Sequence, residues 1–160
     1  MDAIVCKKGC CSLKILPKIK PGESEGYKPP YPFEKRKAGV YVYCGNKILL
    51  TQSYNKCWGI PKGQMEVLDQ STKICAEREL KEETGLSIDL KDHDLYRIVL
   101  DNNYIYRVQI ESVDLVDVGE LANLDSTGIG WVNIECAFDF NLNYLTKKIL
   151  TDVYYDVRFT

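Results

Sequence analysis

The 160-residue sequence has only one histidine and no apolar run of 18 residues or more. Because a membrane-spanning helix needs about 20 consecutive apolar residues, we expect no membrane partner. The N-terminus also lacks the apolar block of a secretory signal. The seven cysteines are an odd number in a chain that is not short, which disfavours a disulfide framework. These absences predict a cytoplasmic protein with reduced thiols.

Three of the cysteines, Cys6, Cys10 and Cys11, lie close together near the N-terminus. A zinc site would need a fourth ligand and usually shows paired ligand spacing. The lone histidine, His93, is far along the chain in a charged stretch, where we do not expect it to be catalytic. Reduced thiols that lie partly in the core are therefore the favoured interpretation of the three cysteines.

Charge and proline divide the chain into two parts. Residues 1–37 hold 9 Lys and Arg against 4 Asp and Glu, whereas residues 38–160 hold 12 against 19. Five of the six prolines fall within residues 17–32, which is typical of an extended connector. We predict a basic N-terminal segment over 1–37 and one compact domain over 38–160. The basic segment suits a polyanion such as RNA, and a solubilising tail is an equal alternative.

The hydrophobic patterning of residues 38–160 predicts an α/β domain with a mixed sheet and two main helices. One helix is expected over 72–84, capped by Asp69 or Ser71 and ended by Gly85. The other helix is expected from 141 to about 157. Strands are expected at 38–44, 47–52, 58–63, 86–90, 96–100, 104–113 and 129–134.

Three glutamates in the first helix are the strongest candidate for chemistry. Glu79, Glu82 and Glu83 stand at i, i+3 and i+4, so a helix places them on one side. They repel one another there, and they lie near the helix C-terminus, where the macrodipole disfavours anions. A divalent cation reverses this argument, because Mg²⁺ prefers oxygen ligands. The alternative to a cation site is a solvated acidic helix in an RNA- or protein-binding domain.

The loop before this helix supports the cation. Gly63 allows the backbone to approach a metal or a phosphate closely, and Lys62 offers a point charge for phosphate oxygens. The stretch 78–86, Arg-Glu-Leu-Lys-Glu-Glu-Thr-Gly-Leu, matches the REUXEEXGU half of the Nudix box at every fixed position. The region from Gly63 to Leu86 therefore resembles the Nudix hydrolase family, and the lead-in Trp58 to Gly63 is similar to decapping-type members such as those of large DNA viruses.

Two departures from the family pattern GX5EX7REUXEEXGU stand out. Gly63 and Arg78 enclose 14 residues instead of 13, so the loop is one residue longer. The first glutamate of the pattern has no match, because its place falls at Asp69 or Gln70. In the family that glutamate mostly braces the loop and the start of the helix. Asp69 could do the same as a helix cap.

The resemblance implies a Nudix-type α/β/α sandwich and a metal-dependent pyrophosphohydrolase. Glu79, Glu82 and Glu83 would hold Mg²⁺ or Mn²⁺, helped by the Gly63 carbonyl oxygen, and Arg78 would orient Glu79 by an ion pair. The metal would bridge the diphosphate oxygens, stabilise the leaving phosphate and activate the attacking water.

The general base is a separate question. The family uses a box glutamate or an acid from a later loop, for which the candidates here are Asp114, Asp117, Glu120 and Asp125. Asp125 is our first choice because it precedes Trp131 by about the distance found in decapping-type relatives, and Glu120 is the second. Each of these acids taken alone is as consistent with an ordinary surface loop. Tyr54, before Trp58, is a candidate for stacking on a base.

The box predicts the reaction but leaves the leaving group open. The basic residues 1–37 favour capped RNA, the lead-in agrees with it, and a dinucleoside polyphosphate is next. Nucleoside triphosphates and diphosphoinositol phosphates are further alternatives, and no DNA duplex is expected as a partner. A non-catalytic Nudix-fold module that binds RNA or a nucleotide is another alternative. Such modules usually lose a box glutamate, and all three are present here.

Overall fold

The computed structural model describes residues 3–16, 35–52, 56–115 and 126–155. The strands in these ranges are β1 Ala3–Val5, β2 Ser12–Ile15, β3 Lys37–Cys44, β4 Lys47–Gln52, β5 Trp58–Gly59, β6 Lys62–Gln64, β7 Leu95–Val99, β8 Asn103–Gln109 and β9 Gly128–Asn133. The helices are α1 Thr72–Thr84, α2 Ile134–Ala137 and α3 Tyr144–Tyr155, with one 3-10 turn, η1, over Val113–Leu115. None of these helices is long and apolar enough to cross a bilayer.

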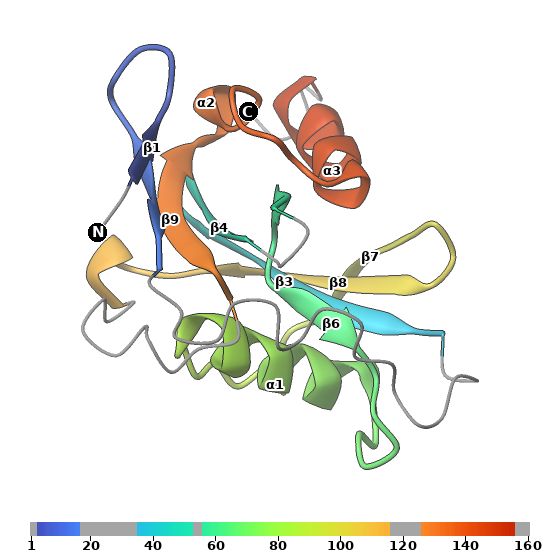
Figure 1. The fold of residues 1–160 in the computed structure, drawn as a ribbon. Helices are drawn as coiled ribbons and strands as arrows, with labels where there is room; N and C mark the ends of the chain where they lie inside the picture. Colours follow the sequence, from blue (N-terminus) through green and yellow to red (C-terminus); the bar gives the residue numbers. More distant parts are fainter. Residues whose placement is uncertain (1–2, 17–34, 53–55, 116–125, 156–160) are drawn as a thin grey trace.

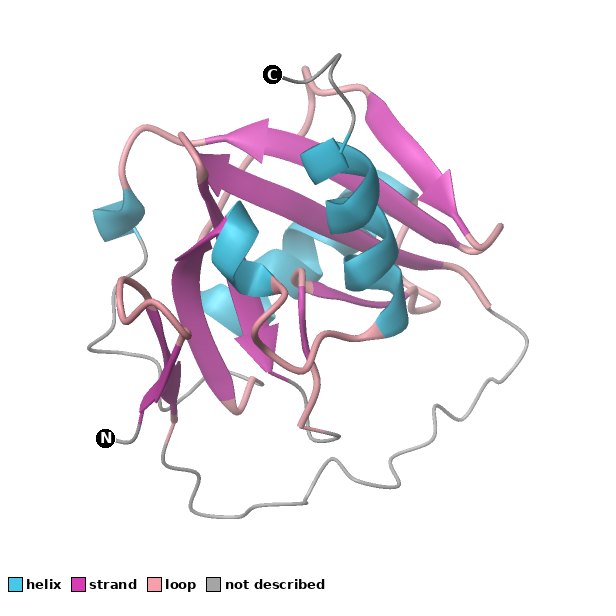
Figure 2. Ribbon diagram, turned by 90° about the horizontal axis from the view of Figure 1, so that it is seen from above, coloured by secondary structure: helices cyan, strands magenta, loops and turns pink. Residues whose placement is uncertain are grey.

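The strands form one mixed sheet in the order β1-β2-β9-β4-β3-β8-β7, while β5 pairs with β4 and β6 pairs with β3. The β3–β8 pair is parallel over seven registered residues, and the other strand pairs are antiparallel. Helix α1 lies on one face of the sheet and α2 and α3 on the other (Figure 1). Seen from above, α3 lies over the central strands (Figure 2). The predicted α/β/α sandwich with a mixed sheet is confirmed.

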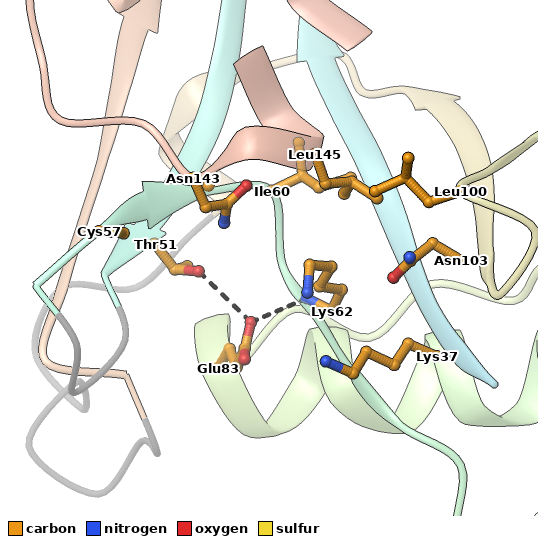
Figure 3. Close-up of a pocket in the computed structure, with 11 residues that line it drawn as sticks. Lys37, Thr51, Cys57, Ile60, Lys62, Glu83, Leu100, Asn103, Asn143 and Leu145 are labelled. Carbon is orange, nitrogen blue, oxygen red and sulfur yellow. Dashed lines mark hydrogen bonds between the residues drawn. The ribbon is translucent and has the colours of Figure 1, made fainter. Parts of the chain in front are cut away.

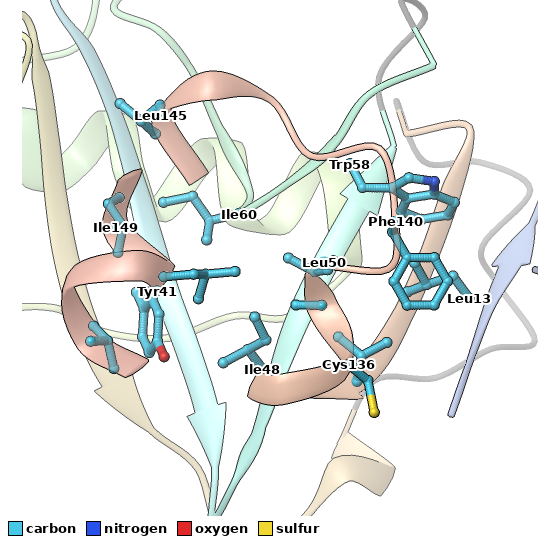
Figure 4. Close-up of a cluster of buried hydrophobic side chains, with 14 of the residues drawn as sticks. Leu13, Tyr41, Ile48, Leu50, Trp58, Ile60, Cys136, Phe140, Leu145 and Ile149 are labelled. Atoms are coloured by element: carbon cyan, nitrogen blue, oxygen red, sulfur yellow. The ribbon is translucent and has the colours of Figure 1, made fainter. Parts of the chain in front are cut away.

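The central strands are buried on both faces, so alternate residues feed two separate cores. In β4, Ile48 and Leu50 pack under α2 and α3, and Leu49 packs under α1. Successive side chains in a strand point to opposite faces, which explains why this strand is a nearly unbroken apolar run. Figure 4 shows the first of these cores, where Trp58 and Phe140 lie beside the side chains of β4.

The sheet includes residues from the N-terminal side of Lys37. Strands β1 and β2 form a hairpin, and β2 pairs with β9 through Lys14–Ile129 and Ile15–Gly128. Leu13 of β2 is fully buried in the core that α3 covers. The described part of the basic segment thus packs on the domain, while residues 17–34, which carry its five prolines, lie outside the described residues.

The predicted strand over residues 86–90 is wrong. The segment runs without strand pairing after α1, and its alternation has another cause: Leu86 and Leu90 are buried in the α1 core while Ser87 and Asp89 are exposed. The N–H of Leu90 donates to the Glu77 side chain at 3.3 Å. A helix-packed loop therefore reproduces the pattern of a half-buried strand.

Other boundaries shift by a few residues. Strand β8 ends at Gln109, short of the predicted end at 113, where the 3-10 turn begins. Helix α3 begins at Tyr144, not at 141, because Asn141 and Asn143 make backbone bonds to Trp58 of β5. The short helix α2 was not predicted, since four residues are too few for a periodic pattern.

Candidate active site

Helix α1 carries the predicted acids, and its ends are fixed by local chemistry. Ser71 accepts a hydrogen bond from the N–H of Ile74 at 3.2 Å, which makes it, and not Asp69, the N-cap. Gly85 ends the helix in the left-handed conformation at φ 77°. The apolar side of the helix, with Cys75, Ala76 and Leu80, is buried against the sheet. Burial of this side turns the polar side toward the β6 loop.

Arg78 is the centre of a cluster of acids. Its guanidinium donates to Asp69 through Nε–Oδ1 at 3.1 Å and Nη2–Oδ2 at 2.7 Å. Its Nη1 lies 3.0 Å from Glu79 and 3.2 Å from Glu82, and 3.5 Å from the more exposed Glu66. The expected ion pair between Arg78 and Glu79 is therefore present in the structure.

Asp69 takes over the bracing role that the missing glutamate of the box would have. Its side chain is only 4% exposed, and it also accepts the backbone N–H of Glu66 at 2.8 Å. Burial acts to raise the pKa of this carboxyl, but the hydrogen bonds from Arg78 and Glu66 outweigh burial and hold the pKa below its usual value. The same pairing raises the pKa of Arg78. Asp69 thus fixes the long loop to the helix through Arg78.

Glu83 lies in different surroundings from the other two glutamates. Its carboxylate accepts the backbone N–H of Lys62 at 3.1 Å and the hydroxyl of Thr51 at 3.3 Å. Burial, and then the nearby charge of Glu79, raise the pKa of Glu83 to about 8. The two donors carry no full charge, so the ionised carboxylate is only partly compensated. A cation beside Glu79 and Glu83 would remove this penalty.

The three glutamates leave the helix from one side but do not meet at one point. Among the described residues, their oxygens do not form a set that lies within 4.8 Å of one another. The physical reason is that Arg78 holds Glu79 and Glu82, while the Lys62 amide holds Glu83. Helical spacing determines from which side of the helix each side chain leaves the backbone. The nearest hydrogen-bond donors determine where its carboxyl group lies.

Gly63 touches the acid cluster directly. A Cβ atom at this position would overlap the carboxyl group of Glu79, so only glycine lets β6 and α1 approach this closely. The Gly63 carbonyl oxygen accepts a hydrogen bond from the Cys75 thiol at 3.7 Å. The backbone of Gly63 therefore lies against the carboxyl group of Glu79, and carboxylate and carbonyl oxygens are the hard ligands that a divalent cation such as Mg²⁺ or Mn²⁺ prefers.

A cavity of about 300 Å³ opens beside Glu83 (Figure 3). One end is polar, with Glu83, Lys62 and Lys37, and the other is apolar, with Leu100 and Leu145. The remaining lining residues are Thr51, Cys57, Gly59, Ile60, Asn103 and Asn143. Small-molecule sites commonly combine an apolar wall with a few placed polar groups. The cavity can therefore receive a phosphate chain at one end and an apolar ring at the other.

Lys62 is a half-buried cation of this cavity. Burial, and then the neighbouring Lys37, lower the pKa of its ammonium group, while Glu83 and Glu79 act in the opposite direction. Two ammonium groups that repel one another in a partly dry site favour an anionic ligand between them. Lys62 was predicted from the sequence as a phosphate-binding residue, and it lines this cavity.

Several predicted residues lie outside the described part of the chain. These are Tyr54, Asp117, Glu120 and Asp125. Asp114, another candidate base, is exposed and is bonded to Ser112. Sequence reasoning missed the cavity residues Lys37, Asn103 and Asn143. Lys37 had a usable signal, since it begins the strand that pairs with β6, but the asparagines had none.

Comparison with known proteins places this geometry in a family. The NUDIX domain family matches residues 34–138. The chain is 64% identical over 150 residues to "Putative hydrolase 111R" of Invertebrate iridescent virus 3, a match that covers 94% of this chain and 88% of that one. A match over this much of both chains shows common membership, so the chain belongs to the Nudix hydrolase family.

Solved structures show the same fold at low sequence identity. A C. elegans Ap4A hydrolase in a binary complex superposes with a TM-score of 0.56 at 17% identity, covering 74% of this chain and 96% of that one. A bifunctional NMN adenylyltransferase/ADP ribose pyrophosphatase from Francisella tularensis, complexed with AMP and a Mn ion, gives a TM-score of 0.56 at 18% identity, covering 79% of this chain and 42% of that one.

Proposed function

We propose that this Nudix hydrolase cleaves a diphosphate linkage in a nucleoside-diphosphate-linked substrate and depends on Mg²⁺ or Mn²⁺. The observation that carries the proposal is the raised pKa of Glu83, close to Glu79 and at the polar end of a cavity with two lysines. A half-buried acid of this kind is unfavourable for the empty protein and useful beside a cation and a phosphate chain. The bound metal would polarise the diphosphate oxygens and favour attack by water.

Different residues along the cavity bind the phosphate oxygens and the metal. Lys62 and Lys37 bind the phosphate oxygens, and the metal contacts come from Glu79, Glu82, Glu83 and the Gly63 carbonyl oxygen. Glu82 reaches this set by exchanging its contact with Arg78, while Arg78 keeps its paired bonds to Asp69. These assignments agree with the residues that line the polar end of the cavity, which are Glu83, Lys62 and Lys37.

The apolar end and the proton transfer involve other residues. Leu100 and Leu145 line the wall against which a base would pack, and Tyr54 is the candidate to stack on it. Asp125 is the proposed general base, with Glu120 as the second candidate. Asp125 directly precedes Ser126, whose hydroxyl donates to the main-chain oxygen of Glu83 at 2.7 Å. This bond connects the residue after Asp125 to the catalytic helix.

Glu83→Gln is the variant that tests the reaction. Hydrolysis of a mixed nucleotide panel should need Mg²⁺ or Mn²⁺ and fall on the order of 100-fold in this variant. The matched control is Glu111→Gln, an exposed glutamate outside the cavity, which should keep full activity. Reaction in ¹⁸O-labelled water identifies the phosphorus that is attacked. Equal turnover by Glu83→Gln, or turnover that survives complete removal of divalent cations, contradicts the proposal.

Capped RNA is the proposed substrate within this class, because residues 1–37 are basic and suit a long polyanion. A dinucleoside polyphosphate is the second candidate, supported by the likeness to the C. elegans Ap4A hydrolase. Turnover of capped RNA should fall with rising salt more steeply than turnover of a dinucleoside polyphosphate. Replacing Lys18, Lys20 and Lys28 by Gln should reduce that salt dependence. Deleting residues 1–36 is a poorer test, since it also removes the buried Leu13.

A further inference from the structure

Four cysteine sulfurs gather where the β1–β2 hairpin meets α2, and none of these cysteines lines the cavity beside Glu83. The Sγ atom of Cys10 lies 3.6 Å from that of Cys6, 3.4 Å from that of Cys11 and 3.5 Å from that of Cys136. All four sulfurs lie within 4.8 Å of one another. Four sulfurs at Zn–S distances of ~2.3 Å in a tetrahedron are about 3.8 Å apart. The cluster therefore already has nearly the size of a tetrahedral metal site.

The fold builds this cluster from two distant parts of the chain. Cys6, Cys10 and Cys11 lie in the turn of the β1–β2 hairpin, which is closed by a bond from the Cys6 N–H to the Cys11 carbonyl at 3.0 Å. Gly9 supplies the left-handed residue that this turn needs, at φ 77°. Cys136 comes from α2, 126 residues after Cys10. It is the fourth ligand that the three N-terminal cysteines lack in the sequence.

The cluster has one exposed cysteine, and a polar side chain lies beside it. Cys6, Cys11 and Cys136 are buried, and Cys10 lies at the surface as the outer member. The Asn133 side-chain amide approaches the Cys10 sulfur at 3.8 Å. A metal with four thiolates carries a net charge of −2, and polar groups next to such a site help to hold its ligands.

Two lysines lie within the same turn. Lys7 and Lys8 stand between the cysteines in the sequence, and they pair with Asp139 at 4.0 Å and Glu135 at 3.8 Å. The backbone N–H of Lys7 also donates to Asp139 at 2.9 Å. The turn is therefore held against α2 by bonds that do not involve sulfur, and its positive charges lie close to where an anionic centre would form.

A disulfide bond or simple core packing fits the cluster less well than a metal does. The sulfurs are at van der Waals separation, well beyond the 2.05 Å of a disulfide bond, and all four cysteines are free. Single buried cysteines commonly pack as small apolar residues. Such packing does not explain why four thiols contact one another, or why the set includes the exposed Cys10.

We propose that Cys6, Cys10, Cys11 and Cys136 bind one structural Zn²⁺ ion. Zinc with four thiolate ligands leaves no open position for substrate, so the site is distinct from the oxygen-rich site on α1. The ion fastens the N-terminal hairpin, and with it β2 at the edge of β9, to α2. The three N-terminal cysteines are free and two of them are buried, as the sequence indicated, and the proposal adds a metal ion to them.

The test begins with the unaltered full-length chain, purified with Mg²⁺ present and without added zinc. Elemental analysis and native mass spectrometry should find about one zinc ion per chain. Stepwise modification of the thiols by an organomercurial should release that zinc as the four cluster cysteines react. Reconstitution with Co²⁺ should give the intense visible absorption of tetrahedral thiolate coordination. A chain that folds and stays stable without zinc, or that holds iron or a disulfide at these cysteines, overturns the proposal.

Variants then assign the ligands. Cys10→Ser changes the exposed ligand and so disturbs packing least; it should lose bound zinc and lower the melting temperature by on the order of 10 °C. Cys136→Ser should do the same, and the matched control Cys44→Ser, in β3, should keep its zinc. Glu83→Gln should also keep its zinc, which separates this site from the proposed hydrolytic one. Full zinc content in both Cys10→Ser and Cys136→Ser contradicts the assignment.

Discussion

The guanidinium of Arg78 donates two parallel hydrogen bonds, of 3.1 and 2.7 Å, to the carboxylate of Asp69. Arg78 lies on helix α1, and Asp69 lies in the loop that is one residue longer than the family pattern. The pair thus compensates for the missing first glutamate of the box. An ammonium group cannot form these two parallel hydrogen bonds to one carboxylate.

Replacing Arg78 by Lys should therefore destabilise the protein although the charge is kept. We expect a loss of about 3 kcal/mol in the free energy of unfolding, because Asp69 is left buried without its two-point partner. Urea unfolding followed by circular dichroism measures this loss. Arg97→Lys is the control, since Arg97 forms a more exposed pair with Asp152. A loss no larger than in that control argues against the bracing role.

The raised pKa of Glu83 predicts a pH-dependent stability of the metal-free protein. The folded chain favours the protonated carboxyl, so this group contributes its full stability below its ordinary pKa of 4.5. That contribution declines as the pH rises and is lost above about 8. The difference in melting temperature between the unaltered chain and Glu83→Gln should follow this course from pH 5 to 9. Added Mn²⁺ should flatten it, and a pH-independent difference would contradict the shift.

Gly63→Ala should damage the site through the Glu79 carboxyl, which the added Cβ would overlap. We expect kcat to fall by at least about tenfold, together with a loss of about 1–3 kcal/mol in stability. Gly45→Ala is the matched control. Gly45 has φ 59° but open space around its Cβ, so its substitution strains a turn without touching the site. Equal activity in the two alanine variants would show that the close approach has no catalytic role.

Lys62→Met should weaken substrate binding more than it slows turnover. The ammonium group lies in the cavity with its pKa lowered by burial, and an anionic phosphate chain would restore its favourable charge. We expect KM to rise by about tenfold with a smaller change in kcat. Lys147→Met, on the exposed side of α3, provides the comparison in steady-state kinetics. An unchanged KM would remove Lys62 from the phosphate site.

Local signals in the sequence predicted local structure well. The helix over residues 72–84, its end at Gly85 and the strand over residues 47–52 were predicted as the structure has them. Each depends on neighbours a few residues away. Local signals gave a wrong prediction at residues 86–90. Alternation of apolar and polar residues indicates alternating burial, and a packed loop can show it as well as a strand.

Relationships between distant residues could not be predicted from one sequence. Nothing near Cys10 indicates Cys136, and nothing near Glu83 indicates that the Lys62 amide would draw it away from Glu82. The spacing of the glutamates correctly placed them on one side of α1. The surrounding donors set the directions of the carboxylates. Arg78 of α1 holds Glu79 and Glu82, and donors from β4 and β6 hold Glu83.

The pairing of β2 with β9 has a consequence for how the chain assembles. Lys14 of β2 pairs with Ile129 of β9, so the β1–β2 hairpin is joined to the sheet by a strand that lies far along the chain from it. Contacts this far apart in sequence form late, because the loop that joins them must first be closed. Leu13, which is fully buried in the folded chain, should therefore gain its native core only after β9 has joined β2.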